Sequence, residues 1–450
     1  MNLYFKRLTQ LPLVKAMTNR WLLAALCTGV SSPILANDLW TLYQSAQQKN
    51  GNWSAQQYEY LANKKNTQLA YGDMLPQVGV QGSLKRSHFY PSDDNIPDVG
   101  NGSGQVGIGF RQALYRADKW ATYEKAVLAD QASRLQLQQQ SQQLTEQIIK
   151  AYLNVLRAEA VTESLNAEYT AIKAQDTMMQ ARLAEGVVAR VDTEETRARL
   201  ESVVALIANN DVAILTAKQQ LSLLTGQPIN DLDQLKQPIN TELVAASSIE
   251  SWLTQAQTNN IDVQLAQTNL AIANKQVDFL KANLYPKVDL VGNVGWQTNT
   301  NNGPTYADGT NYSIGIEMDW PLYTGGRTSA GLDQGRLQAQ ASQSRLAYVY
   351  QAATTQASQA YLNLVGQKAT IKAQQTAVEA NAKVAQASKV GYDLGVRSMV
   401  DTLLAERQYY AARRDLISAY FDYLNAYVDL QKASGNLSAN TVRVIDSLLQ

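Results

Sequence analysis

The chain has 450 residues, with 39 basic and 39 acidic side chains, 45 % apolar residues, one cysteine and one histidine. This length is enough for two or three ordinary domains with sizeable apolar cores. The balanced charge argues against a nucleic-acid-binding protein, and the scarcity of cysteine and histidine argues against a disulfide framework or a metal site.

The first 36 residues read as a secretory signal peptide. Four basic residues precede a short apolar run from Trp21 to Val30, and the small and polar segment 31–36 follows it. The run is roughly half of the about 20 apolar residues that a membrane-spanning helix needs, so we expect cleavage after Ala36. Removal of the segment, which contains Cys27, leaves 35 basic and 39 acidic residues and no thiol or lipid anchor.

The rest of the chain contains two copies of one pattern. Four landmarks of the first half recur in the second half at offsets of 210, 209, 209 and 209 residues. They are Leu75-Pro76-Gln77-Val78 and Tyr285-Pro286-Lys287-Val288, Ala151-Tyr152-Leu153-Asn154 and Ala360-Tyr361-Leu362-Asn363, Gly186 with Asp192 and Gly395 with Asp401, and Gly226 and Gly435. We interpret the chain as an internal tandem repeat, with the first repeat at 37–245 and the second at 246–450.

In the first repeat the pattern predicts a helix at about 38–72, strands at about 77–88 and 103–114, and helices at about 118–185 and 192–224. Val78, Val80 and Leu84 alternate with polar side chains, and this period of two indicates a strand with one apolar face. The long proline-free stretch would form a helix about 100 Å long. The apolar residues of its shorter partner recur at spacings of three, four and seven, as coiled-coil packing requires.

The second repeat has the same predicted order, with a helix at about 249–284, strands at about 287–298 and 311–322, and helices at about 327–394 and 401–433. Its last strand has the clearest alternation, with one face formed by Tyr312, Ile314, Ile316, Met318, Trp320 and Leu322. The stretches between paired strands, near 86–104 and 298–311, are rich in Asn, Asp, Gly, Ser and Pro and are expected to be solvated loops. His88 falls in the first of these loops, as an ordinary surface residue.

The strands have the length and the two-faced pattern of transmembrane β-barrel strands. No run of 18 apolar residues follows Ala36, so we expect any second entry into a membrane to use such a barrel. Four strands per chain cannot close a barrel, because the smallest known barrels have about eight strands. Several chains must therefore share one barrel. Closure requires at least two copies, and the strand count alone does not distinguish two copies from three. The long helices between the strand pairs weigh against a soluble sandwich.

Two turns carry a resemblance to the TolC family of outer-membrane efflux proteins: Leu322-Tyr323-Thr324-Gly325-Gly326-Arg327 and, above all, Gly395-Val396-Arg397-Ser398-Met399-Val400-Asp401. With the proline-led strands and the two repeats, the resemblance extends over the whole mature chain. The first repeat departs from it, with Leu114-Tyr115-Arg116-Ala117 in place of the Gly-Gly turn. The resemblance implies a mixed α and β membrane protein, a homotrimer whose shared twelve-stranded transmembrane β-barrel continues into a coiled-coil periplasmic tunnel of twelve α-helices.

The same resemblance implies an exit duct in the cell outer membrane. Such a duct passively conducts drugs, small molecules or unfolded proteins from a tripartite efflux pump or type I secretion system to the exterior. The implied partners are a periplasmic adaptor (membrane fusion) protein, an inner-membrane transporter of the RND, ABC or MFS type, and outer-membrane lipid. Whether the duct serves many transporters or one stays open, because the transporter selects the cargo.

By the same resemblance, the residues of a periplasmic gate are Asp401, Arg397, Tyr392 and Asp192. Asp401 would form a ring of acidic side chains on the channel axis, while Tyr392 and Arg397 would tie the helices of the second repeat to the turn at Asp192. The family's second acidic position is Leu404 in this chain, so a single ring with weaker cation binding is expected.

Other interpretations of these residues and of the whole chain stay open. Asp192 and Asp401 stand where a helix N-cap belongs, Asp192 with Glu195 fits a capping box, and Arg397 can be a solvated charge. A secreted or periplasmic coiled-coil scaffold or adhesin would explain the helices but would leave the amphipathic strands without a role.

An enzyme is not expected. The mature chain has no cysteine, no histidines and carboxylates at metal-ligand spacing, and no phosphate-binding glycine loop between a strand and a helix. Neither a cofactor nor a metal ion is expected.

Overall fold

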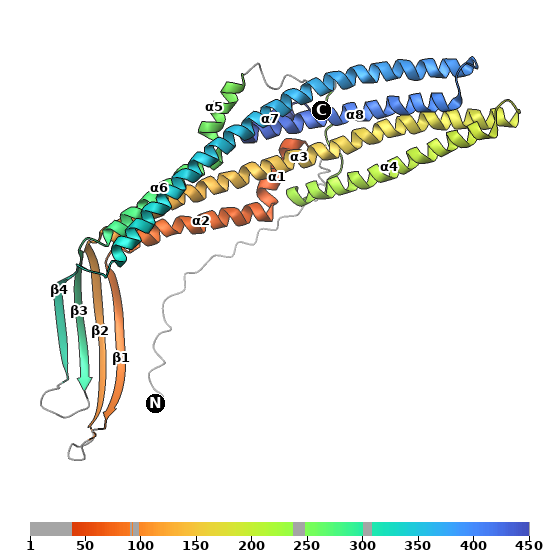
Figure 1. The fold of residues 1–450 in the computed structure, drawn as a ribbon. Helices are drawn as coiled ribbons and strands as arrows, with labels where there is room; N and C mark the ends of the chain where they lie inside the picture. Colours follow the sequence, from red (N-terminus) through yellow and green to blue (C-terminus); the bar gives the residue numbers. More distant parts are fainter. Residues whose placement is uncertain (1–37, 91, 93–98, 237–247, 300–307, 450) are drawn as a thin grey trace, which may run out of the picture. The chain divides into compact units, whose positions relative to one another are not determined.

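The computed structural model describes residues 38–90, 92, 99–236, 248–299 and 308–449. The expected signal peptide at 1–36, and the parts of the two expected loops at 91, 93–98 and 300–307, lie outside these residues. The elements, mostly helices with one sheet, are shown in Figure 1. In chain order they are α1 (Leu39–Lys49), α2 (Gly51–Gly72), β1 (Gln77–Phe89), β2 (Val99–Tyr115), α3 (Ala117–Ala184), α4 (Arg190–Thr225), α5 (Ile249–Asn259), α6 (Ile261–Ala282), β3 (Lys287–Asn299), β4 (Gly309–Asp319), α7 (Arg327–Asp393), α8 (Met399–Ala433) and α9 (Ala439–Asp446).

The strands form one antiparallel sheet in the order β1-β2-β3-β4, so the central pairing joins the two halves of the chain. Directly opposed residues share a face of a sheet, and the register aligns Val80, Ile108, Val294 and Tyr312 in one row. All four of these side chains are exposed. One face of the sheet is therefore apolar and uncovered within the described chain.

The strand expected at 311–322 ends earlier, because β4 stops at Asp319. Pro321 has no N–H and cannot donate a ladder hydrogen bond. The indole of Trp320 donates instead to the backbone carbonyl of Leu284 at 3.1 Å, which ties the end of the sheet to the end of α6. The alternation of apolar residues continues past the point where backbone pairing stops.

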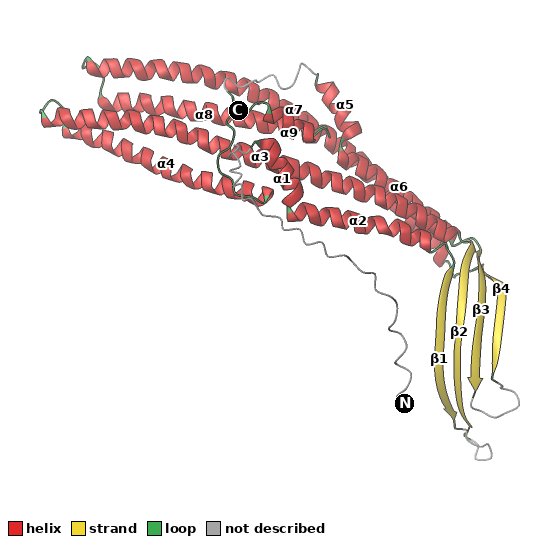
Figure 2. Cartoon of the chain, turned by 180° about the vertical axis from the view of Figure 1, so that it is seen from behind, coloured by secondary structure: helices red, strands yellow, loops and turns green. Residues whose placement is uncertain are grey.

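The long helices α3 and α7 have 68 and 67 residues. α2 and α4 pack against α3, and α6 and α8 pack against α7 (Figures 1 and 2). α6 and α8 also pack against α3, so helices from both halves of the chain form one packed region. Proline-free helices of this length need partners along their whole length, and shorter helices laid end to end supply them.

The single helices expected at 38–72 and 249–284 are wrong, because each is two helices. Asn50 and Asn260 have extended backbones, with ψ values of 114° and 128°, and separate α1 from α2 and α5 from α6. The side-chain oxygen of Asn50 accepts a hydrogen bond from the amide of Trp53, and that of Asn260 accepts one from the amide of Asp262, both at 2.9 Å. An asparagine that caps a helix in this way favours a new start over continuation.

Each of these asparagines also reaches the end of a remote helix. The side-chain amide of Asn50 donates to the carbonyl of Leu224 in α4, and that of Asn260 donates to the carbonyl of Ala433 in α8, each at 3.0 Å. One side chain thus satisfies orphan backbone groups at the start of one helix and at the end of another. We call these two arrangements the asparagine joints. They hold α4 end to end with α2, and α8 end to end with α6.

The main apolar core surrounds the middle of α3 and the second half of α8. Ile148 and Tyr152 of α3 and Leu424 of α8 are fully buried there. The short helices α1 and α9 pack over this core. α9 is not predicted from the sequence, because a helix of eight residues is too short to show a periodic pattern.

Helix α4 has many apolar side chains that stay exposed within the described chain. By length and composition it is apolar enough to cross a membrane, and only 6 % of its most apolar window is buried in the described chain. Four of its exposed apolar side chains lie on one side of the helix, namely Val204, Val212, Leu215 and Leu223. We call this set the α4 stripe.

Candidate functional site

The turns that end the two long helices have the same construction. Gly186 and Gly395 have φ values of +73° and +75°, a conformation that glycine adopts without strain. After each helix, the amides of the glycine and of the next residue donate to carbonyls of the last helical turn. The longer-range bond of each pair runs from the amide of Val187 to the carbonyl of Arg182 at 3.0 Å, and from the amide of Val396 to the carbonyl of Gly391 at 2.9 Å. This is the Schellman pattern, which stops a helix sharply and reverses the chain. After each turn the chain runs back along the long helix as the shorter helix, α4 or α8.

Asp401 is the third residue of α8 and not its N-cap, because the helix begins at Met399. The N-cap is Ser398, whose hydroxyl accepts from the amide of Asp401 at 3.1 Å. The carboxylate in turn accepts from the hydroxyl of Ser398 at 2.8 Å and from its amide at 3.3 Å. These hydrogen bonds hold the pKa of Asp401 below its usual range. Asp401 is therefore an ionised member of a capping box at the tip.

Asp192 occupies the matching place in α4, which begins at Arg190. The expected capping box of Asp192 with Glu195 is wrong, because the N-cap is Ala189, which has no side chain to accept a bond. The backbone carbonyl of Asp192 accepts from the hydroxyl of Thr196 at 2.9 Å. The carboxylate of Asp192, half-buried, makes no hydrogen bond within the described chain.

Tyr392 joins the last turn of α7 to α3. Its hydroxyl donates to the sulfur of Met179 at 3.4 Å, and the guanidinium of Arg182 lies 5.8 Å from the centre of its ring. Arg182 also faces the carboxylate of Asp393 at 3.9 Å. These contacts connect the first long helix to the second near the turn. Neither Met179 nor Arg182 is predicted as a site residue from the sequence.

Within the single chain, Arg397 packs against Gly391 at the end of α7. Its amide donates to the carbonyl of Gly391 at 3.1 Å, and its side-chain carbons lie so close to Gly391 that a Cβ there would come within 2.7 Å. The guanidinium makes no ion pair with the residues that the structure describes. Within one chain, neither Arg397 nor Tyr392 is brought within hydrogen-bond distance of Asp192, so that expected link stays a prediction.

Sulfur-containing side chains form the apolar part of this end. Met179 of α3 and Met399 and Leu403 of α8 are buried together, and Met178, Val188 and Tyr392 pack against them. We call these six residues the tip cluster. Methionine side chains adapt their shape easily, so such a cluster permits rearrangement at a lower cost than one of branched side chains.

A buried ion cluster lies further along the same helices. Glu168 of α3 is fully buried and forms ion pairs with Arg199 of α4 and Arg414 of α8. The second repeat has no charge at the positions equivalent to Glu168 and Arg199. At an offset of 209 residues, Ala377 takes the place of Glu168 and Gln408 takes the place of Arg199. A charge present in only one copy of a repeat is the sequence signal that could have identified this cluster.

The described residues offer no metal site. They contain no group of three or more histidine, cysteine, aspartate or glutamate side chains placed to hold a metal ion. His88 lies in β1, opposite Gly100 of β2, and not in the expected loop. Its ring lies 4.3 Å from that of Tyr90.

The chain matches one protein family in two segments. Residues 42–227 and 252–436 match the family described as outer membrane efflux protein. Among curated relatives, the outer membrane protein TolC of Vibrio cholerae is 25 % identical over 438 residues, which cover 95 % of this chain and 97 % of that protein. The alkaline protease secretion protein AprF of Pseudomonas aeruginosa is 23 % identical, over 94 % of this chain and 90 % of that protein.

Solved structures show the same fold. The structure of CusC has a TM-score of 0.78 and 19 % identity, and the alignment covers 89 % of this chain and 92 % of that one. The outer membrane protein VceC of Vibrio cholerae has a TM-score of 0.75 and 18 % identity, with coverage of 88 % and 96 %. At these identities the likeness concerns the fold alone.

Proposed function

This chain belongs to the outer membrane efflux protein family, a family of channel proteins and not of enzymes, and from this membership we propose that it is a TolC-type exit duct. In this role it resides in the outer membrane and extends into the periplasm. It passively conducts drugs, small molecules or unfolded proteins from an efflux pump or a type I secretion system to the exterior.

The exposed apolar face of the four-stranded sheet is the observation that carries the proposal. Within the described chain β1 and β4 pair on one side only, so the sheet has two open edges. Unpaired backbone groups in lipid cost several kcal/mol each, roughly, and a closed barrel removes them. Three copies of this sheet would supply twelve strands, and the trimer is the assembly that family membership supports.

The tandem repeat is part of the same proposal. The family match falls in two segments of similar length, and the two halves share the order of two helices, two strands, a long helix and a shorter helix. The α4 stripe gains a role in the trimer, because a neighbouring copy can cover it. The helices of three copies would then enclose the tunnel.

The gate is proposed at the hairpin turns, where Asp401 presents an ionised carboxylate in each copy. Three such groups around an axis would repel one another and attract cations. Arg397, unpaired within one chain, is available to bond Asp192 of a neighbouring copy. Tyr392 would hold the tip closed through Met179, a contact within the chain.

The partners are proposed from the kinds of system in which relatives occur. The names of two relatives refer to the secretion of proteases, and the name of a third refers to efflux. We therefore propose a periplasmic adaptor protein and an inner-membrane transporter of the RND, ABC or MFS type. Cargo selection would lie with the transporter.

Two measurements test the proposed function. The protein expressed in a Gram-negative host should fractionate with the outer membrane, and the purified protein should form discrete conducting channels in planar bilayers. Fractionation as a free periplasmic protein, or an intact oligomer that neither inserts into bilayers nor conducts, would favour the coiled-coil scaffold instead.

A further inference from the structure

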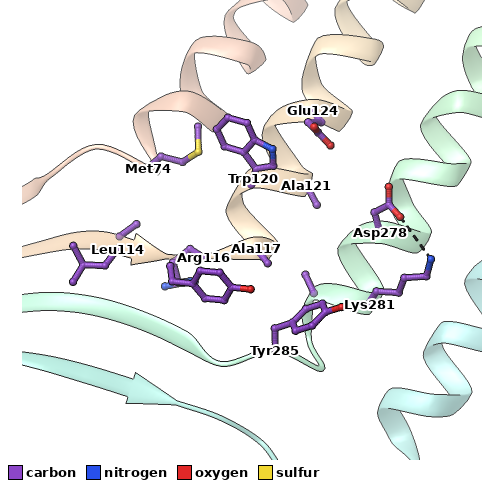
Figure 3. Close-up of a pocket in the computed structure, with 13 residues that line it drawn as sticks. Met74, Leu114, Arg116, Ala117, Trp120, Ala121, Glu124, Asp278, Lys281 and Tyr285 are labelled. Carbon is purple, nitrogen blue, oxygen red and sulfur yellow. Dashed lines mark ion pairs between the residues drawn. The ribbon is translucent and has the colours of Figure 1, made fainter.

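A pocket of about 550 Å³ lies where β2 continues into α3 and where α6 ends (Figure 3). Its wall includes Tyr115, Trp120 and Tyr285, whose side chains are 50 %, 56 % and 51 % exposed. Tyrosine and tryptophan, with an apolar ring and a hydrogen-bonding end, are favoured at the headgroup level of a membrane. These aromatics indicate that the pocket lies at the membrane surface. We call it the junction pocket.

The junction pocket is continuous with the apolar face of the sheet. A shift of register between Ala113 and Tyr115 brings Tyr115 opposite Val288 in β3, and Val288 stands opposite Met318 in β4, so the three share one face. Val294 is an even number of residues from Val288 on the same strand, which makes this the exposed apolar face already described. A ligand with its polar part in the pocket can therefore lay hydrocarbon chains on the sheet.

The charged residues of the pocket are two cations and two carboxylates. Arg116 is already paired with Asp118 at 2.9 Å and with Asp289 at 3.0 Å, which leaves Lys281 as the cation available to a ligand. Lys281 has one ion pair in the part of the chain that the structure describes, with Asp278 at a distant 3.9 Å (Figure 3).

The two carboxylates have spare accepting capacity. Glu124 and Asp278 share one ammonium, that of Lys275, at 2.8 Å and 3.4 Å. Their side chains remain 36 % and 46 % exposed. Each carboxylate can accept about four hydrogen bonds, so both can receive a further donor.

This arrangement matches a headgroup that carries both signs of charge. A phosphate can bond Lys281 at a closer distance than Asp278 does, and a primary ammonium can donate to Glu124 and Asp278. A purely anionic headgroup would place its negative charge against the two carboxylates. A quaternary ammonium has no N–H to donate to them.

We propose that the junction pocket binds the headgroup of a zwitterionic phospholipid with a primary amine, taken from the periplasm-facing leaflet. The phosphate lies at Lys281, the ammonium lies at Glu124 and Asp278, and the acyl chains cover the apolar face beyond Tyr115. The inference rests on the proposed function, because it requires the strands to be in a membrane. Three such lipids per trimer would fix the depth of the barrel in the bilayer.

The test uses the purified full-length oligomer, stripped of lipid in detergent and then exposed to phosphatidylethanolamine, phosphatidylcholine and phosphatidylglycerol in equal amounts. Native mass spectrometry counts the lipid that stays bound. The wild type should retain phosphatidylethanolamine in preference to the other two. Lys281→Gln should reduce the retention of every phospholipid by about tenfold, the effect of losing one charge-assisted hydrogen bond.

Two further variants make the result specific. Glu124→Gln should abolish the preference for phosphatidylethanolamine and raise the share of phosphatidylglycerol, because it removes a negative charge and frees Lys275. Lys64→Gln, an exposed change of the same kind on α2, should leave retention unchanged. Equal retention of the three lipids by the wild type, or equal losses in Lys64→Gln and Lys281→Gln, would overturn the assignment. Failure to conduct in bilayers would contradict the proposed function and not the pocket.

Discussion

At the residue scale, the contact between Tyr392 and Met179 changes the expected picture of the gate. The resemblance predicts that Tyr392 acts through Asp192, but in the single chain its hydroxyl donates to a thioether instead. A thioether is a weak acceptor, so most of the cohesion of the tip comes from the buried apolar tip cluster. Within one chain, apolar burial therefore contributes more to holding the tip together than the hydrogen bond of Tyr392 does.

The double variant Tyr392→Phe with Arg397→Ser should raise the mean single-channel conductance. Losing one hydrogen bond weakens the closed state by about 1 kcal/mol, which is about fivefold in a closed-to-open equilibrium. Planar-bilayer recordings measure the change. Met179→Leu, which keeps the volume and removes the sulfur, should reproduce part of it, and should add nothing in a chain that already has Tyr392→Phe.

Asp38→Ala serves as the control for the conductance measurement. It removes the N-cap of α1, away from the hairpin turns, costs on the order of 1 kcal/mol locally and should leave the conductance unchanged. If the Tyr392 and Arg397 variant conducts like the parent while it remains a folded oligomer, these two residues are structural and the gate lies elsewhere.

Glu406 of α8 predicts a pH effect on stability. Burial raises the pKa of its carboxyl, since the ammonium of Lys389 and the guanidinium of Arg199 offset only part of the desolvation, and the nearby Glu168 adds repulsion. One of its oxygens is buried without a hydrogen-bond partner. A raised pKa means that the folded chain holds the proton more tightly than the unfolded chain, so stability falls as the pH rises through the folded pKa.

Glu406→Gln should therefore raise the urea midpoint of unfolding at pH 7, and the advantage should disappear below about pH 4, where both states of the parent are protonated. Midpoints of parent and variant at pH 4, 5.5 and 7 measure it. Glu163→Gln, an exposed change on α3, should shift no midpoint at any pH. A constant advantage for Glu406→Gln at all three values would contradict the desolvation account.

At the element scale, the sequence predicts the strands and the long helices to within a few residues but not their interruptions. Alternation in the strands and the absence of proline in α3 and α7 are strong local signals. The asparagine joints give a weaker signal. Asn50-Gly51 is a dipeptide typical of turns, but Asn260 has no glycine or proline beside it, and each break also depends on a carbonyl of a remote helix. The tip cluster and the Glu168 cluster are equally non-local, so their members could not be grouped from spacing alone.

The joints predict unequal costs for one substitution. Asn260→Ala removes an N-cap, worth about 1 kcal/mol, and leaves the carbonyl of Ala433 without its partner in a buried site, for about 1–3 kcal/mol more. Asn50→Ala should cost less, because its joint is only partly buried. Hydrogen exchange at the ends of α8 and α4 should show faster opening at the affected joint alone, and equal protection in both variants would contradict the assignment.

At the scale of the whole molecule, neighbouring copies in the proposed trimer would cover the α4 stripe and the open sheet edges. Leu215→Glu should weaken the oligomer, because it places a charge in an apolar contact between copies. Cross-linking in mild detergent and the temperature at which the oligomer dissociates measure the loss. Gln220→Glu adds the same charge on another side of α4 and should dissociate like the parent; equal behaviour of both variants would remove the α4 stripe from the interface.

The pairing of β2 with β3 also has a consequence for biogenesis. Val106 and Trp296 stand opposite each other although about 190 residues separate them in the chain. Pairings between such distant segments form slowly, and unpaired strand edges aggregate readily. During export the hairpin of β1 and β2 therefore lacks its partner strand β3, and its apolar face stays exposed, until nearly two-thirds of the polypeptide has crossed the inner membrane. During this interval the exposed apolar face and the unpaired strand edges favour aggregation.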